Sequence, residues 1–338
     1  MSIICIVGAG ATGLLLLLLL QESGFDMSKV AIVDPYLDGG DLARKWTAVI
    51  SNTPWSKSVN ALKVACPSIS IPTREGPDTT TPLIEIAHLL RGLASTALKN
   101  TRQVQGNVVS CKYDSTTRMW TTTAETGGAQ LLSIQTSKLI LAQGGEPKKM
   151  NLPIPAIPLE IALDVDRLKH YVKKSENILV FGTMHSGTLV IQNGASLGAN
   201  VTAYYNTEQP FYWARDGFYD GIKADAAEIA DKIVAGVTPV TLVSTKDTAQ
   251  VIRTSHGAQW AVFAMGFQSR HINIIVDDKP CSHMEYDGHT GRLINAPAAW
   301  GFGIAYPNSA PDGVHFDVSV AAFLEHMKPQ ISAILAGL

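Results

Sequence analysis

The chain has 338 residues, of which 46% are hydrophobic and 17% charged, and its formal net charge is −2. This length favours two domains over a single core. The near-neutral charge gives no electrostatic basis for binding nucleic acid or an anionic membrane surface.

The first predicted unit is a strand, a glycine-rich turn, a helix and a second strand. Ile3–Val7 is a short apolar run typical of a strand, Leu14–Leu20 indicates a helix, and Val30–Val33 indicates a strand that ends at Asp34. The turn has G-x-G-x-x-G spacing within GAGATG, residues 8–13. This order of elements predicts a dinucleotide-binding βαβ unit, with Asp34 placed to accept hydrogen bonds from a ribose diol.

Each glycine of the turn has a separate physical role. Gly8 allows the tight turn, Gly10 keeps a Cβ away from a pyrophosphate, and Gly13 lets the helix lie close to the strand. The helix N-terminus directs N–H groups and a partial positive charge at the phosphates. A signal peptide or membrane helix is the alternative for residues 3–20. No Lys or Arg precedes that stretch, so we expect a buried helix and no membrane insertion.

The four cysteines lie far apart and form neither a C-x-x-C pair nor a metal-ligand spacing. They predict reduced thiols, a cytoplasmic location and no metal site. Cys66, in a loop before Pro67, is the candidate for a reactive thiol.

The middle of the chain changes from helical to strand periodicity. Residues 83–98 indicate a helix, and residues 104–142 indicate four successive strands with Gly-Gly and Asp-Ser-Thr turns. A proline-rich stretch at 147–158 follows as a linker between domains.

A second βαβ pattern begins after the linker and repeats the first. Asn177–Phe181 indicates a strand, GTMHSG a turn, Thr188–Leu197 a helix and Val201–Tyr205 another strand. Met184 replaces the middle glycine, and no acid or arginine follows the second strand, so the sequence leaves open whether this turn binds a nucleotide. The candidate residues of this second site are Gly182, His185, Ser186 and Gly187, with His185 alternatively a helix-capping residue.

Two further segments close the chain. Trp260–Phe263 indicates a strand that runs into Ala264-Met265-Gly266, and this echoes Ala142-Gln143-Gly144. Asp317–Leu335 has helical periodicity and predicts one closing helix.

Six short motifs together resemble the flavoprotein superfamily with two dinucleotide-binding domains, which includes pyridine nucleotide–disulfide oxidoreductases, thioredoxin reductases and flavin-containing monooxygenases. The motifs are GAGATG with Asp34, Gly39-Gly40 with Trp46, LAQGGEP (141–147), VFGTMHSG (180–187), VFAMGF (262–267) and GFGIAYP (301–307). The chain departs from the superfamily in lacking a paired redox cysteine motif, the F-x-G-x-x-x-H linker motif and an aspartate in GFGIAYP.

The resemblance implies an α/β fold with two Rossmann-like domains, the second inserted in the first, and a small antiparallel β meander. Residues 1–150 plus 262–338 would bind FAD, and residues 151–261 would form an NAD(P)-binding-like domain. The residues expected at the FAD are Gly8, Ala9, Gly10, Ala11, Thr12, Gly13, Asp34, Pro35, Trp46, Asn52, Thr53, Val108, Ala142, Gly144, Gly145, Gly303 and Ile304.

The function expected from this resemblance is an FAD-dependent oxidoreductase, an NAD(P)H-linked reductase or monooxygenase acting on a small molecule. Two alternatives remain open: a flavoprotein oxidase without its own pyridine-nucleotide site, and a non-catalytic FAD-binding or interaction protein. The sequence assigns no catalytic residue and leaves open whether the chain forms a homodimer.

Overall fold

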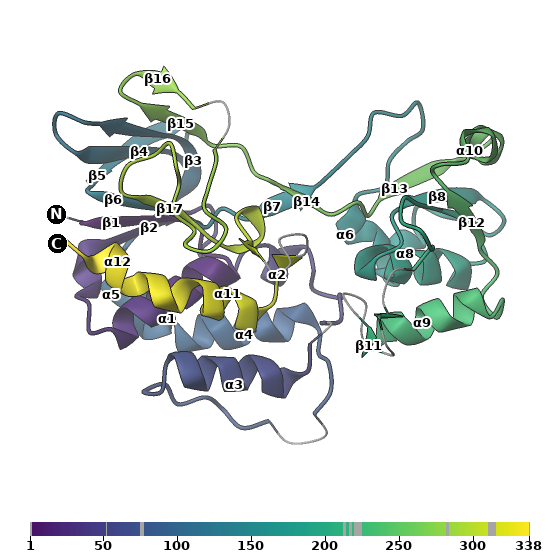
Figure 1. Cartoon of the computed structure of the whole chain (residues 1–338), viewed down its shortest axis with the longest axis horizontal. Helices are drawn as coiled ribbons and strands as arrows, with labels where there is room; N and C mark the ends of the chain where they lie inside the picture. The colour runs from purple at the N-terminus through teal and green to yellow at the C-terminus, as the bar shows by residue number, and fades with distance from the viewer. Residues whose placement is uncertain are drawn as a thin grey trace. The chain divides into compact units, whose positions relative to one another are not determined.

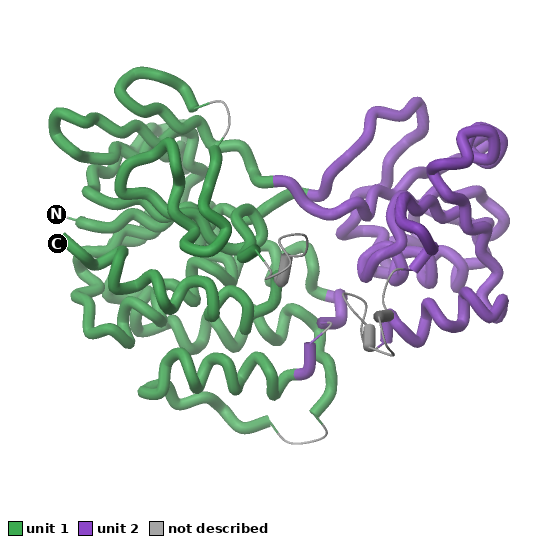
Figure 2. The backbone as a smooth tube through the Cα atoms, in the orientation of Figure 1, with its two compact units in different colours: residues 1–47, 55–146, 269–338 green, residues 48–54, 147–268 purple. Residues whose placement is uncertain are grey.

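The computed structural model describes residues 2–51, 53–74, 78–211, 214–215, 218–219, 225–281, 284–309 and 316–337. The chain divides into two compact units (Figure 2). Unit 1 consists of Met1–Thr47, Trp55–Glu146 and Ser269–Leu338, and unit 2 of Ala48–Pro54 and Pro147–Gln268. The chain therefore leaves unit 1 and returns to it, and a short early stretch belongs to unit 2. The cofactor assigned to each domain stays a prediction.

Unit 1 is built on a nine-stranded mixed sheet with β1 near its middle. β1 lies between β2 and β6, and its parallel register pairs Ile4 with Val30 and with Lys138. The main path of the sheet is β16-β15-β3-β2-β1-β6-β17, and β4 and β5 extend from β3. Its strands are β1 (Ile4–Val7), β2 (Val30–Asp34), β3 (Arg102–Asp114), β4 (Met119–Thr126), β5 (Gln130–Thr136), β6 (Lys138–Leu141), β15 (Asn273–Val276), β16 (Lys279–Pro280) and β17 (Ala299–Gly301).

Helices cover one face of this sheet (Figure 1). They are α1 (Ala11–Glu22), α2 (Asp41–Arg44), α3 (Trp55–Ala65), α4 (Leu83–Leu93), α5 (Ser95–Asn100), α11 (Val320–Met327) and α12 (Ile331–Leu335), with short 3-10 turns η1 (Met27–Lys29), η2 (Gly303–Ala305) and η3 (Lys328–Gln330).

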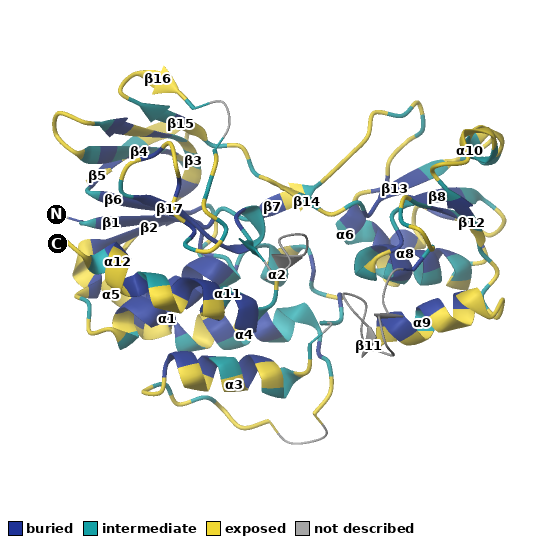
Figure 3. Cartoon of the chain, viewed as in Figure 1, coloured by how far each residue is buried: buried dark blue, intermediate teal, exposed yellow. Residues whose placement is uncertain are grey.

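The first helix, α1, is the centre of the larger core. All seven residues of Leu14–Leu20 are 0–3% exposed, because the β1 sheet lies on one side and α3, α4 and α11 contribute to the same core (Figure 3). This confirms the expected buried helix. Within the described part of the chain, no helix is long and apolar enough to cross a membrane.

The antiparallel meander β3–β4–β5 covers the other face. It buries Cys111, Trp120 and Ile134 against Cys5 and Leu139 of the central strands. The Trp120 indole N–H donates to the carbonyl of Pro297 at 2.8 Å, so the ring's one polar atom is satisfied inside the core. The three antiparallel strands confirm the predicted meander, whereas the last of the four predicted strands, β6, pairs in parallel with β1 and β17.

Unit 2 has a four-stranded parallel sheet in the order β12-β9-β8-β13. Its described elements are α6 (Leu159–Ala162), α7 (Val165–Leu168), β8 (Asn177–Phe181), α8 (His185–Ser196), β9 (Asn200–Tyr205), β10 (Ala214–Arg215), β11 (Phe218–Tyr219), α9 (Asp225–Val234), β12 (Thr241–Ser244), α10 (Thr248–Ser255) and β13 (Trp260–Phe263). Two short pairs complete the described strands. β7 (Gly145–Pro147) pairs with β14 (Phe267–Ser269), and β18 (Asn308–Ser309) pairs with β19 (Phe316–Asp317) in unit 1.

The closing helix is divided where the sequence predicted a continuous one. α11 ends at Met327, η3 follows, and α12 begins at Ile331. Pro329 causes the break because it has no N–H to donate to the preceding turn. The side chain of Lys138, 7% exposed, anchors the end of α12 by donating to the carbonyls of Ile334 and Ala336.

A buried histidine on α11 makes the fold sensitive to acid. His326 is 3% exposed, its ring meets the Phe302 ring edge-on at 5.1 Å, and its Nε2 has no hydrogen-bond partner among the described residues. Burial lowers the pKa of His326 to about 4, with the Asp287 carboxylate opposing and His289 adding to that effect.

The folded chain should therefore lose stability as pH falls from about 6.5 toward 4, because the unfolded histidine takes up a proton that the folded one excludes. The loss is at most about 3 kcal/mol. His326→Met should reduce the difference between urea unfolding at pH 7 and at pH 4.5. His88→Met on the exposed side of α4 is the control, and an equal acid sensitivity in both variants would contradict the assignment to His326.

Candidate functional site

The turn between β1 and α1 is shaped by backbone contacts too close for side chains. Gly8 has φ +104°, and a Cβ there would lie 2.3 Å from the carbonyl oxygen of Ala142. A Cβ on Gly13 would lie 2.0 Å from the carbonyl oxygen of Gly8. Both positions therefore require glycine for the fold itself.

Gly10 differs from these two glycines. It is the N-cap of α1 with an ordinary φ of −72°, and a Cβ built on it would meet nothing within 4 Å. An α-helix leaves its first N–H groups without intrahelical acceptors, so the first-turn amides of Ala11, Thr12 and Gly13 are available to an anionic ligand. Open space beside a helix N-terminus is what the diphosphate of an adenine dinucleotide needs.

Two other loops border this turn. Gly39 forms an isolated parallel bridge with Gly10, and a Cβ on Gly40 would lie 2.8 Å from the Cα of Gly10. A Cβ on Gly303 would lie 2.2 Å from Oγ1 of Thr12. The structure thus brings Ala142 and Gly303 to the turn, as the motifs predicted. Gly40 was not among the predicted contact residues, although its Gly-Gly pair was a visible signal.

Asp34 is engaged with the main chain. One carboxylate oxygen accepts the N–H of Ala9 at 2.8 Å, and the other accepts the N–H groups of Tyr36 and Leu37, each at 2.8 Å. The residue is 8% exposed. A carboxylate offers about four acceptor positions, so three are filled here. Asp34 therefore ties the glycine turn to the loop after β2, and its ribose contact stays a prediction.

The remaining residues predicted at the FAD are more scattered. Pro35 follows β2, Trp46 is buried, Val108 pairs with Ala124 in the β3–β4 ladder, Gly144 has φ +71° beside buried Gly145, and Ile304 lies in η2. Thr53 belongs to unit 2, where its N–H donates to Ser51 Oγ at 3.0 Å. Asn52 lies outside the described residues.

One ion pair near the turn could not be found from the sequence. The guanidinium of Arg270 pairs with the Asp41 carboxylate and also donates to the carbonyl of Gln143 at 3.2 Å. These residues are separated by as many as 229 positions, and no local pattern connects them. The pair fixes the start of α2 to the segment after β6.

The second turn repeats the backbone of the first. Gly182 has φ +103°, and its Cβ would lie 2.3 Å from the carbonyl oxygen of Ala264. A Cβ on Gly187 would lie 2.0 Å from the carbonyl oxygen of Gly182. Met184 is the N-cap of α8 with φ −77° and ψ −170°, against −72° and −169° at Gly10. The helix therefore begins at His185, three residues before its predicted start.

The side chains of this second turn decide what it can accept. Met184 is 41% exposed, at the position where the first turn is open. His185 Nε2 lies 3.4 Å from the carbonyl of Ile50, and its Nδ1 has no partner among the described residues. Burial lowers the pKa of His185, so the ring is neutral at physiological pH. Ser186 follows it in the first turn of α8.

The cysteines give no redox pair. Cys66 is fully buried. Its burial, and to a smaller extent the nearby Glu22 carboxylate, raises the pKa of the thiol to about 11. Its prediction as a reactive thiol is wrong, because a protonated, enclosed thiol is a poor nucleophile. No group of His, Cys, Asp or Glu residues in the described ranges could hold a metal ion.

Comparison with known proteins supports this architecture. No protein-family model matches the chain. Monooxygenase AgnR1 of Paecilomyces divaricatus is 23% identical over 96% of this chain and 95% of its own length. Bacillithiol disulfide reductase Bdr (YpdA) of Staphylococcus aureus has a TM-score of 0.63 at 12% identity, covering 99% of this chain and 98% of its own.

Two other solved structures give the same picture. Thioredoxin reductase of Lactococcus lactis has a TM-score of 0.57 at 10% identity, covering 98% of both chains. OTEMO, solved with FAD and NADP, has a TM-score of 0.56 at 14% identity, covering 89% of this chain and 80% of its own. The fold is that of the two-dinucleotide-binding-domain flavoproteins. The resemblance and the fold class predicted from the sequence are confirmed.

This flavoprotein fold makes the space beside Gly10 testable. Gly10→Ala should leave folding intact, because the backbone is ordinary and the added Cβ enters open space, but it should lower FAD retention by about tenfold or more by obstructing the diphosphate. Gly92→Ala is the matched control: this glycine lies within α4, and a Cβ on it also meets nothing within 4 Å. Bound flavin per chain and thermal unfolding are measured together. Unchanged flavin content in the Gly10 variant would contradict the placement.

Proposed function

We propose that the chain is an FAD-dependent oxidoreductase that acts on a small molecule and uses NAD(P)H as reductant. The observation that carries this proposal is the open glycine turn at Gly10, beside the N-terminus of a buried helix. A curated monooxygenase matches over nearly the whole chain, as do the folds of a bacillithiol disulfide reductase and a thioredoxin reductase.

The residues present fit FAD at the first turn. The amides of Ala11, Thr12 and Gly13 would hold the diphosphate, and the Asp34 carboxylate would hold the turn in shape through Ala9. When bound, the isoalloxazine ring supplies the electron transfer, while the protein binds, orients and shields it. Gly40, Ala142 and Gly303 would limit the space around the dinucleotide.

A second candidate function is a flavoprotein oxidase that its own substrate reduces. The observation that favours it is Met184, whose side chain stands where a nicotinamide dinucleotide would approach the second turn. A reductase with separated cysteines cannot relay electrons through a redox pair, so in either case the reaction would take place at the flavin.

The deciding experiment is spectroscopic. Purified protein, or protein reconstituted with FAD, should be yellow and show the flavin absorption bands. Anaerobic NADH or NADPH should bleach it if the proposal is correct, whereas bleaching by substrate alone would support the oxidase. Protein that stays colourless after reconstitution would contradict both.

Met184 provides a direct test of pyridine-nucleotide use. Met184→Gly should lower the Kd for NADH or NADPH by about three- to tenfold, because it recreates at the second turn the open space seen at Gly10. Met150→Gly, at another exposed methionine of unit 2, is the control. Equal nucleotide affinity in the two variants would show that Met184 does not obstruct the turn.

A further inference from the structure

A hollow of about 630 Å³ lies in unit 1, separate from the glycine turn. Its lining includes Gln143, Arg270, Ile274, Cys281, Met284 and the two tyrosines 286 and 306. A volume of this size falls within the usual range for a small-molecule pocket.

The hollow borders the segments predicted to contact FAD. Gln143 lies between Ala142 and Gly144 in the chain, and the lining residue Ala305 directly follows Ile304. A molecule in the hollow would therefore lie beside two stretches assigned to the cofactor.

Two tyrosine rings in the wall of the hollow are held by a ring contact and by hydrogen bonds. The rings of Tyr286 and Tyr306 meet edge-on with centroids 5.3 Å apart. The Tyr286 hydroxyl donates to the carbonyl of Pro307 at 3.0 Å, and the Gln143 amide donates to the Tyr306 hydroxyl at 3.2 Å. Ile274 and the adaptable side chain of Met284 add apolar surface. Fixed ring edges beside aliphatic groups suit a flat apolar molecule.

The interior carries little uncompensated charge. The cation of Arg270 is already paired with Asp41. Burial raises the pKa of both Tyr286 and Tyr306, so both phenols stay neutral. His271 and Glu285 are exposed residues of the lining. An anionic ligand would have to give up its hydration without gaining a free cation in return.

We propose that this hollow is the substrate pocket and that it binds an uncharged, flat, apolar molecule. Calling the ligand a substrate rests on the proposed function, whereas its binding does not.

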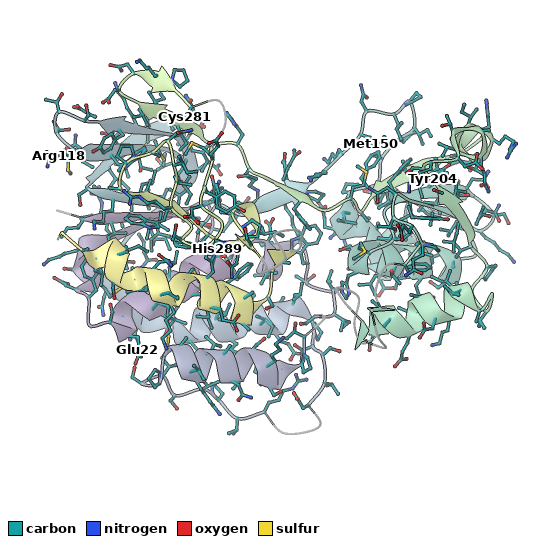
Figure 4. The ribbon with its side chains drawn as sticks, in the orientation of Figure 1. Glu22, Arg118, Met150, Tyr204, Cys281 and His289 are labelled. Atoms are coloured by element: carbon teal, nitrogen blue, oxygen red, sulfur yellow. The ribbon has the colours of Figure 1, made fainter. Side chains whose placement is uncertain are left out.

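Cys281 gives a built-in reporter of occupancy (Figure 4). It lines the hollow and is partly exposed, while Cys5, Cys66 and Cys111 are all fully buried. A thiol reagent should therefore modify Cys281 first, and a molecule in the hollow should protect it.

The experiment uses the full chain supplemented with FAD and measures the rate at which iodoacetamide alkylates Cys281, read by peptide mass spectrometry. Saturating 2-naphthol, which is uncharged at neutral pH, should slow the rate by about fivefold or more, and the 2-naphthoate anion should slow it by less than about twofold. Cys281→Ser should remove the labelled peptide. Equal protection by the two probes, or protection by neither, would overturn the proposal.

A substitution that fills the hollow tests whether 2-naphthol binds there. Met284→Trp should abolish protection by 2-naphthol, whereas Met150→Trp, at an exposed methionine of unit 2, should keep it. Protection that survives Met284→Trp would overturn the proposal. Flavin absorbance is recorded on the same samples: flavin without protection contradicts the pocket alone, and protection without flavin supports the pocket while contradicting the oxidoreductase function.

Discussion

The structure depends on two backbone contacts at which no side chain can fit. Gly8 lies against the carbonyl of Ala142, and Gly182 lies against the carbonyl of Ala264, each with room for a hydrogen but not for a Cβ. In each unit this contact joins the first strand of a βαβ unit to the parallel strand beside it, and the next close glycine brings the helix down onto the turn. The helix N-terminus is thereby fixed at the carboxyl end of the sheet, where ligands of such folds bind.

The two turns separate the requirements of folding from those of binding. Their first and third glycines are equally constrained in both units, because the backbone geometry fails without them. The middle position has the same extended backbone in both, yet it is glycine in one and methionine in the other. Backbone geometry therefore permits either residue at this position. The first turn has open space at this position, whereas the second carries the Met184 side chain there.

The sequence predicted the parts of this architecture that local patterns determine. The β1–turn–α1 unit, its repeat at β8–α8–β9 and the meander were all readable, because glycine spacing and hydrophobic periodicity act over a few residues. The sequence did not reveal how Asp34 directs its carboxylate or that Arg270 pairs with Asp41, because both depend on where distant segments meet. The break at Pro329 was a local signal that the apolar periodicity concealed.

Asp34 shows how one methylene group can change the role of a carboxylate. A glutamate at this position would have a longer side chain and would reach further from the strand. The shorter aspartate stays beside its own backbone and accepts three N–H groups there. Those hydrogen bonds occupy the N–H of Ala9, so it cannot donate to a ligand. They also hold the turn in the shape that presents the amides of Ala11, Thr12 and Gly13. Main-chain N–H groups and the open space beside Gly10 would then recognise a ligand at this turn. Asp34 would contribute indirectly, by holding the turn in shape.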